Sequence, residues 1–206
     1  VLDRLDREGN VAHEEDIGSW AEFRAIKSVI DGAKPPEDFE KPWYDYKMVD
    51  DDILLPLMAR GYLLDSSITP EEKKAFLHRK DAGNEENGTA MLRNWNYVLA
   101  RTLPYGEAVK GGKAAPDAWN KLIRIAPGHM AGDWRDSQDG LGKGVYPSSV
   151  NVDLVAESLK SIRDMISSPP FTAGEWEQWA ARGGSGEATR LIRSFANPEG
   201  RARYDK

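Results

Sequence analysis

Apolar residues recur along the chain at the three- and four-residue spacing of helices, and no alternating strand pattern persists beyond four residues. The spacing predicts a first helix over residues 17–30 and a second over residues 46–64. Residues 32–43 lie between these helices, hold three prolines and are expected to form a loop. In the second helix one apolar stripe is formed by Met48, Leu55, Met58, Ala59 and Tyr62.

Capping signals predict where two shorter helices begin. Thr69 precedes Pro70 and lies three residues before Glu72, and Thr172 stands in the same relation to Glu175. The other predicted helices are a long one marked by Met91 to Thr102 and stopped by Pro104 and Gly106, a short one over 116–125, one over 152–166 ended by Pro169, and a last one over 187–196. Seven or eight helices without a fixed repeat predict an all-α fold of helical hairpins packed side by side.

Composition narrows the class of protein. A chain of 206 residues with 40% hydrophobic and 30% charged residues suits one globular domain over residues 1–206. No run approaches the roughly 18 apolar residues of a membrane span, so we expect a soluble protein with no membrane partner. The 28 Lys and Arg residues, against 34 Asp and Glu, form no basic stripe, which argues against nucleic acid as a partner. The compartment is not identified, although Asn87-Gly88-Thr89 would be a glycan acceptor in a secreted protein.

A long glycine-rich segment, residues 126–148, is the first candidate for a functional site. Loops longer than about 15 residues are uncommon in compact domains unless they are functional or disordered, and this one carries His129, Trp134 and Tyr146. A carboxylic acid beside an indole can have a raised pKa and act as a general acid. A surface turn with solvated acids is the alternative. An EF-hand calcium loop is not expected, because the acid spacing is wrong and position 12 is Gly144.

Three other segments combine acids or aromatic rings with polar groups. Residues 13–18 place three acids after His13, but the second histidine of a zinc motif is replaced by Ile17, so no metal site is expected. Residues 43–47 and 93–97 interleave aromatic and polar side chains, as sugar sites do. The alternatives are acids at a helix N-terminus for the first segment and partly buried helix faces for the other two.

Residues 13–18, 44–50, 92–99 and 132–142 occur in an order that resembles the six-hairpin glycosidases related to glycogen debranching enzyme and to processing α-glucosidases. The resemblance covers residues 11–166 and implies an (α/α)6 toroid. It also implies inverting hydrolysis of α-linked glucosides or related oligosaccharides without a cofactor. The aromatic-x-Asp element of these relatives matches Trp134-Arg135-Asp136, which makes Asp136 the expected general acid and Asp133 the second choice. The expected substrate-binding residues are Trp134, Arg135, Glu14, Glu15, Trp43, Asp45, Arg93 and Trp95.

The general base of the resemblance has no match in this chain. Inverting glycosidases place the acid and the base about 6.5–9.5 Å apart, and the relatives supply the base from a downstream glutamate. After Asp136 the glutamates are Glu157, Glu175, Glu177, Glu187 and Glu199, none of them in a matching segment. We therefore expect part of a barrel that is inactive alone and needs the remainder of the barrel as its partner. The alternative is a non-catalytic helical module that binds carbohydrate or protein through its aromatic loops.

Overall fold

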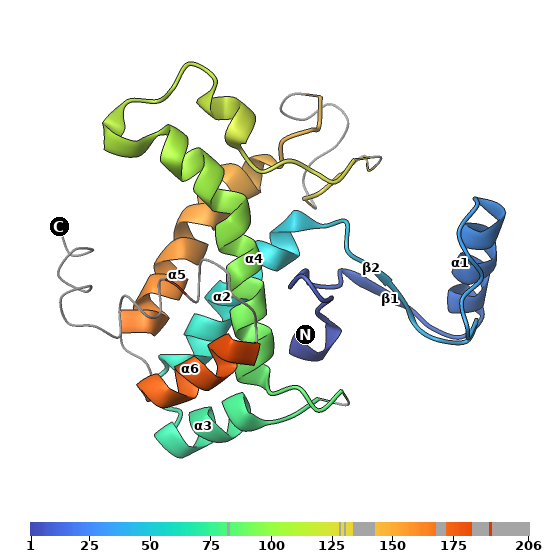
Figure 1. The fold of residues 1–206 in the computed structure, drawn as a ribbon, viewed down its shortest axis with the longest axis horizontal. Helices are drawn as coiled ribbons and strands as arrows, with labels where there is room; N and C mark the ends of the chain where they lie inside the picture. The colour runs from blue at the N-terminus through green and yellow to red at the C-terminus, as the bar shows by residue number, and fades with distance from the viewer. Residues whose placement is uncertain are drawn as a thin grey trace.

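The computed structural model describes residues 1–81, 83–127, 129, 131–133, 143–167, 172–182 and 190. Most of the described chain is helical, as the sequence predicted. Helices α2 (Val49–Leu63), α4 (Asn87–Ala108) and α5 (Val155–Ser167) pack against one another and form the centre of the body (Figure 1). Helices α3 (Pro70–His78) and α6 (Ala173–Arg182) cover one end of α4 (Figure 1). No described helix is both long enough and apolar enough to cross a bilayer.

Three tryptophans close the core between α4 and α6. Trp95 and Trp179 are almost fully buried, and the ring of Trp176 lies 5.3 Å from Trp95 and 5.9 Å from Trp179, centroid to centroid. Buried aromatic pairs of this kind add stabilisation beyond their burial. Around them lie apolar residues from the central helices and from α3, including Val49, Ile53, Leu63, Leu77, Met91, Leu92, Val98, Ile162 and Met165.

Both predicted capping boxes are confirmed. The Thr69 hydroxyl accepts the amide N–H of Glu72 over 3.2 Å, and the Glu72 carboxylate accepts the amide of Thr69 over 2.9 Å. Thr172 and Glu175 repeat the arrangement at the start of α6, with distances of 3.3 and 2.8 Å. These reciprocal bonds satisfy amide groups that the first turn of a helix leaves without partners.

Several predicted boundaries were wrong. Helix α4 continues through Pro104 and Gly106 to Ala108, because a proline near the end of a long, well-anchored helix removes only one backbone hydrogen bond. The helix predicted over 116–125 is reduced to a 3-10 turn, Ala118–Lys121. The helix predicted over 152–166 begins earlier, with a π-helical stretch, Val150–Leu154, ahead of α5. The helix predicted over 187–196 lies outside the described residues except for Arg190.

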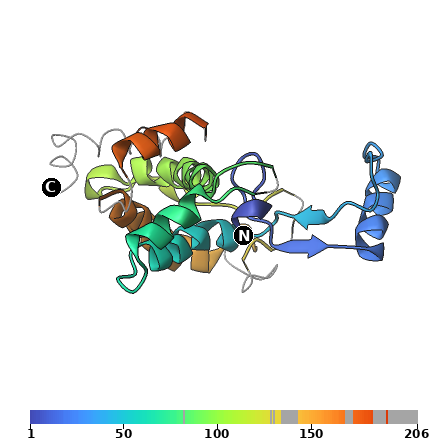
Figure 2. The ribbon, with the colours of Figure 1, turned by 90° about the horizontal axis from the view of Figure 1, so that it is seen from below.

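An arm that the sequence did not predict projects from the helical body. Strands β1 (Glu14–Asp16) and β2 (Trp43–Asp45) pair in antiparallel fashion, and α1 (Ser19–Ile30) lies between them in the chain. Figures 1 and 2 show α1 at the far end of this arm, away from the other helices. The fold is therefore a helical body with a short two-stranded stalk, rather than purely helical. Two strands of three residues are too short to produce a readable alternation of polar and apolar positions.

Candidate functional site at the base of the arm

Five ionisable side chains gather where the arm joins the body. We call them the arm-base cluster: His13, Glu14, Asp45, Lys47 and Asp51. Lys47 Nζ lies 2.7 Å from Asp45 Oδ2 and 3.6 Å from Glu14 Oε2. His13 Nδ1 lies 2.6 Å from Asp51 Oδ2, and its Nε2 lies 3.8 Å from Glu14 Oε1. The cluster thus presents hydrogen-bond donors and acceptors together on a partly exposed surface.

The strand register divides the predicted binding residues between two faces. Glu14 is opposite Asp45 and Asp16 is opposite Trp43, so these four positions share one face of the ladder. Glu15 and Tyr44 occupy the other face. There the Tyr44 hydroxyl donates to Glu15 Oε1 over 2.9 Å, and the Arg4 guanidinium lies 5.6 Å from the Tyr44 ring centroid. Glu14, Trp43 and Asp45 therefore share a face, and Glu15 is held on the opposite side by Tyr44 and Arg4.

The surroundings of Asp45 favour its ionised form. Partial burial alone would raise the pKa of the carboxyl, but hydrogen bonds from the Lys47 side chain and backbone outweigh burial, with the charges of Lys47 and His129 adding to them. The pKa of Asp45 therefore lies below its usual range, while the same contact raises the pKa of Lys47. At neutral pH Asp45 can accept hydrogen bonds, but it has no proton to give to a leaving group.

Backbone contacts attach the glycine-rich loop to the arm-base cluster. The amide of Val49, at the start of α2, donates to the carbonyl of Gly132 over 2.7 Å. A side chain at position 132 would place its Cβ 2.3 Å from Ile125 Cγ2, so only glycine fits this approach. The amide of Ile125 donates to the carbonyl of Val145 over 3.0 Å, which joins the two ends of the loop. Gly132 therefore lies beside the start of α2, just after the segment that carries Asp45 and Lys47.

The expected catalytic loop is described only in part. Trp134, Arg135 and Asp136 lie outside the described residues. Asp133 is described, and its side chain is fully buried. A carboxyl that is shut off from solvent in this way does not face a substrate, which weakens its standing as the second choice for the acid. His129 is exposed and lies close enough to Asp45 to lower the pKa of that carboxyl.

Two predicted binding residues of α4 are placed elsewhere. The Trp95 ring is fully buried in the core, so it offers no face on which a sugar could stack, and the expected binding role is corrected to a packing role. Arg93 forms an ion pair with Glu85 at 2.5 Å.

Trp43 remains 38% exposed and lines a hollow of about 240 Å³ with Ala25 and the loop from Pro36 to Pro42. Trp43 therefore belongs to the arm, where it faces α1.

Glutamates considered as the general base occupy different settings. Glu157 is exposed on α5 and lies 3.5 Å from Lys160. Glu175 closes the capping box of α6 and also contacts Lys74 at 2.9 Å and His78 at 3.1 Å. The hydrogen bond from the Thr172 backbone and those from Lys74 and His78 lower the pKa of Glu175 to about 2, which makes it a weak base. Glu177 is exposed on α6, and Glu187 and Glu199 lie outside the described residues.

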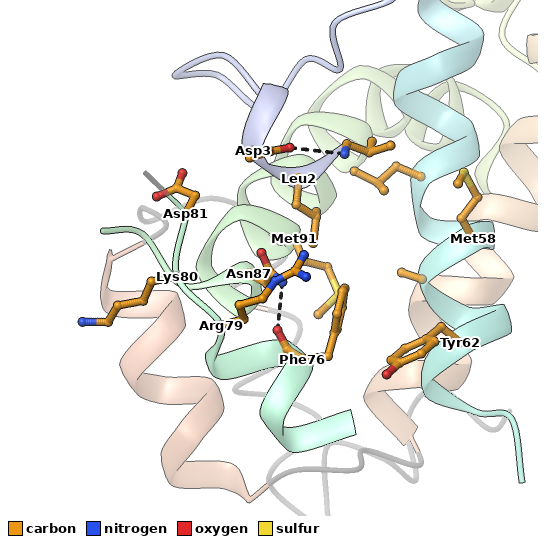
Figure 3. Close-up of a pocket in the computed structure, with 13 residues that line it drawn as sticks. Leu2, Asp3, Met58, Tyr62, Phe76, Arg79, Lys80, Asp81, Asn87 and Met91 are labelled. Carbon is orange, nitrogen blue, oxygen red and sulfur yellow. Dashed lines mark hydrogen bonds and ion pairs between the residues drawn. The ribbon is translucent and has the colours of Figure 1, made fainter. Parts of the chain in front are cut away.

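A separate pocket of about 640 Å³ lies on the helical body (Figure 3). Its wall on α2 includes Leu55, Met58, Ala59 and Tyr62, four members of the apolar stripe predicted for that helix. Asn87 Nδ2 donates to the carbonyl of Phe76 over 2.8 Å at the opposite wall. None of the described residues predicted to bind sugar lines this pocket. Its mostly apolar wall suits an apolar ligand better than a sugar.

Sequence reasoning missed three members of the arm-base cluster: His13, Lys47 and Asp51. Their neighbours Glu14 and Asp45 were predicted, but the contacts that join the five depend on the β1–β2 register and on the start of α2. The described residues contain no group of three or more His, Asp or Glu side chains arranged to hold a metal ion.

Comparison of the chain with protein-family models, with curated proteins and with solved structures found no match.

Proposed function

We propose that this chain belongs to the catalytic part of an inverting glycoside hydrolase that acts on α-linked glucosides or related oligosaccharides. One observation supports the proposal most directly. The hydrogen bond from the Val49 amide to the Gly132 carbonyl brings the start of the loop that carries Trp134 and Asp136 next to the arm-base cluster. Segments 13–18 and 44–50 therefore adjoin Gly132, the first residue of the third segment that carries the resemblance, at one end of α2.

The chemistry of the arm-base cluster suits sugar hydroxyl groups. Each hydroxyl can donate one hydrogen bond and accept others, so a binding surface needs fixed acceptors beside fixed donors. Asp45 and Glu14 provide acceptors, and Lys47 provides donors within 3.6 Å of both carboxylates. Because Asp45 is held in its ionised form, the proposal assigns it to binding and leaves proton donation to Asp136.

The helical body is compatible with part of an (α/α)6 toroid, which we include in the proposal. Helices α2, α4 and α5 pack as neighbours around one apolar core, as the helices of packed hairpins do. The proposed toroid needs further helices beyond those described here. It also needs a base, and we expect that base from outside the segments described in this chain.

Binding of α-linked disaccharides tests the proposal without requiring turnover. We expect titration calorimetry or ligand-observed NMR to detect maltose, kojibiose or nigerose but not the β-linked cellobiose. Lys47→Met should weaken binding by roughly 5- to 50-fold, because it removes the charged donor between two carboxylates. Lys41→Met on the same arm is the matched control and should leave binding unchanged. The proposed substrate class would be contradicted if cellobiose bound as tightly as the α-linked disaccharides. It would also be contradicted if Lys47→Met and Lys41→Met lost the same affinity for these sugars.

An external nucleophile tests the glucosyl site separately from the missing base. With α-glucosyl fluoride and azide, azide would attack the anomeric carbon from the β face, the C–N bond would form, and fluoride would leave with its electron pair. We expect β-glucosyl azide above the uncatalysed background, since azide replaces the water that a base would activate. If the protein adds nothing to this background, the proposal that this chain holds a glucosyl group open to attack from the β face fails.

A further inference from the structure

Helix α1 carries its large apolar side chains on the outside. Only Ala21 and Ala25 are buried, and they turn toward the arm, where Ala25 lines the hollow beside Trp43. The exposed fractions are 65% for Trp20, 52% for Phe23, 44% for Ile26 and 77% for Ile30. An amphipathic helix normally turns its apolar stripe toward a core. Here the two alanines are buried and the large residues face solvent. Helix α1 itself lies at the tip of the arm (Figures 1 and 2).

The spacing of the exposed residues matches one side of a helix pair. Phe23, Ile26 and Ile30 follow one another at intervals of three and four, which are the a, d and a positions of a heptad. Glu22 then falls at the g position and Lys27 at the following e position. In a parallel pair of helices, the g residue of one chain lies beside the e residue of the other chain that is five positions further along the sequence. Glu22 of one copy would therefore meet Lys27 of a second copy, twice across the two-fold axis.

The charges of α1 fit this arrangement and disfavour a lipid surface. The described residues place no cation within ion-pair distance of Glu22, while Lys27 is paired with Asp31 of the same helix. Helices that lie on anionic membranes carry an excess of Lys and Arg on the polar face. Helix α1 and its C-cap carry Glu22 and Asp31 against Arg24 and Lys27, and the whole chain has a net charge of −6. A self-complementary face of this kind fits an identical partner.

We propose that α1 is a homodimerisation helix that pairs in parallel with α1 of a second copy of this chain. The exposed side chains of Trp20, Phe23, Ile26 and Ile30 offer on the order of 500 Å² per copy, so that pairing would bury at most about 1,000 Å² in total. That area is near the lower limit for a specific interface, so the dimer is weak and depends on concentration. Because α1 stands away from the helical body, the two bodies would lie apart on either side of the pair.

Sedimentation or light scattering over about 1–200 µM protein tests whether the dimer forms. The chain should shift from monomer to dimer across this range, and Phe23→Glu should keep it monomeric. Val152→Glu is the matched control, because Val152 is 68% exposed on the body, and this variant should dimerise like the parent. A parent chain that stays monomeric throughout would overturn the proposal. So would an equal effect of the two substitutions, since that would indicate unspecific association.

A charge exchange tests the partner and the register. Glu22→Lys and Lys27→Glu each bring like charges together in a homodimer, so each variant alone should associate at least 5-fold more weakly than the parent. In the first variant both positions are positive and in the second both are negative. An equimolar mixture therefore restores opposite charges at both contacts, and it should recover heterodimers. Circular dichroism must show that both variants keep their helix. Failure of the mixture to recover association would overturn the parallel pairing.

Single cysteines test the orientation, since the natural chain has none. In a parallel pair every core position lies beside its own copy, so Ser19→Cys and Ile30→Cys should each form a disulfide-linked dimer under mild oxidation. These positions are 11 residues apart, about 16 Å along a helix, so an antiparallel pair could not cross-link both. Cross-linking of one variant only would overturn the parallel pairing. Binding of the parent to phosphatidylcholine vesicles in place of dimerisation would show that lipid is the occupant.

Discussion

The carboxylate of Asp52 accepts the amide N–H of Val11 over 2.7 Å, although the two residues are 41 positions apart in the chain. Asn94 adds to this junction by donating to the carbonyls of Gly9, at 3.0 Å, and of Asp52, at 3.2 Å. These three contacts fasten the segment before the arm to α2 and α4. Burial is the largest influence on Asp52 and raises its pKa to about 7, although the Val11 amide and the charge of Arg101 act in the opposite direction.

Asp52→Asn should change the pH dependence of stability. The carboxyl takes up a proton near pH 7 in the fold and near pH 3.8 when unfolded, so the fold favours the protonated form. The free energy of unfolding of the parent should therefore fall as the pH rises from about 4 to about 7, by an amount on the order of a few kcal/mol. Asparagine keeps an oxygen for the Val11 amide and cannot ionise, so the variant should lack this fall. Urea unfolding at pH 4.5, 6 and 8 measures it.

Asp153→Asn is the control for this experiment, because Asp153 is exposed and its replacement should leave the pH profile of the parent intact. The interpretation would be contradicted if the Asp52→Asn variant showed the same decrease between pH 4.5 and 8. Arg101→Met gives a second check. Its guanidinium lies 3.9 Å from Asp52, so removing it should steepen the decrease above pH 6.

Glu175→Gln should destabilise the protein by about 1–3 kcal/mol at pH 7, since it removes a charged partner of the Thr172 amide, Lys74 and His78. The pKa of Glu175 is lowered to about 2 in the fold from about 4.5 when unfolded. The stabilisation is therefore complete above pH 4.5 and is lost as the pH falls toward 2. The difference between parent and variant in urea unfolding should shrink over this interval.

Glu72→Gln is a matched control, because Glu72 closes the other capping box but contacts no residue beyond Thr69 among the hydrogen bonds and ion pairs of the described chain. Glu72→Gln should lower the free energy of unfolding by less than Glu175→Gln does. Equal losses would mean that the contacts of Glu175 with Lys74 and His78 contribute nothing measurable to the attachment of α6.

Helix positions were the most predictable part of this fold because their signals are local. Thr69 with Glu72 and Thr172 with Glu175 each specify a helix start within four residues, and both were predicted. The arm could not be predicted in the same way. Strand β1 pairs with β2 across more than 25 residues, and what brings Glu14 opposite Asp45 is the fold of the intervening helix and loop.

The candidate site shows the same division between local and distant information. Glu14 and Asp45 were predicted, from acidic and aromatic patterns of their own segments and from the resemblance. Trp95 stands in a similar pattern, yet its ring is buried against Trp176, because the helix face it occupies is decided by what packs on α4. A pattern of aromatic and polar residues thus does not distinguish a binding face from a core face until the neighbouring helix is known.

Gly88→Ala should lower the free energy of unfolding by about 1–3 kcal/mol. A Cβ at position 88 would lie 2.5 Å from Trp179 Cδ2, so α4 and α6 would have to move apart. Gly61→Ala is the control within α2, where an added Cβ meets no atom within 4 Å. That substitution should be neutral or stabilise by up to about 1 kcal/mol, because alanine has the higher helix propensity. Equal effects on the thermal midpoint would contradict the close packing of Trp179 on α4.

Asp136→Asn should lower turnover by roughly 10²- to 10⁴-fold in a form of the enzyme that is active on natural α-glucosides, because asparagine cannot protonate the leaving oxygen. Folding should be little changed, which circular dichroism and thermal unfolding would check. Substrates with good leaving groups, such as glucosyl fluoride or dinitrophenyl glucoside, need less help from an acid. The variant should therefore lose less of its turnover on these substrates. Asp45→Asn, whose parent carboxyl is held in its ionised form, should instead weaken binding for both kinds of substrate to a similar extent. If Asp136→Asn reduced turnover of fluoride and natural substrates equally, Asp136 would have a positioning role and the acid would have to be sought elsewhere.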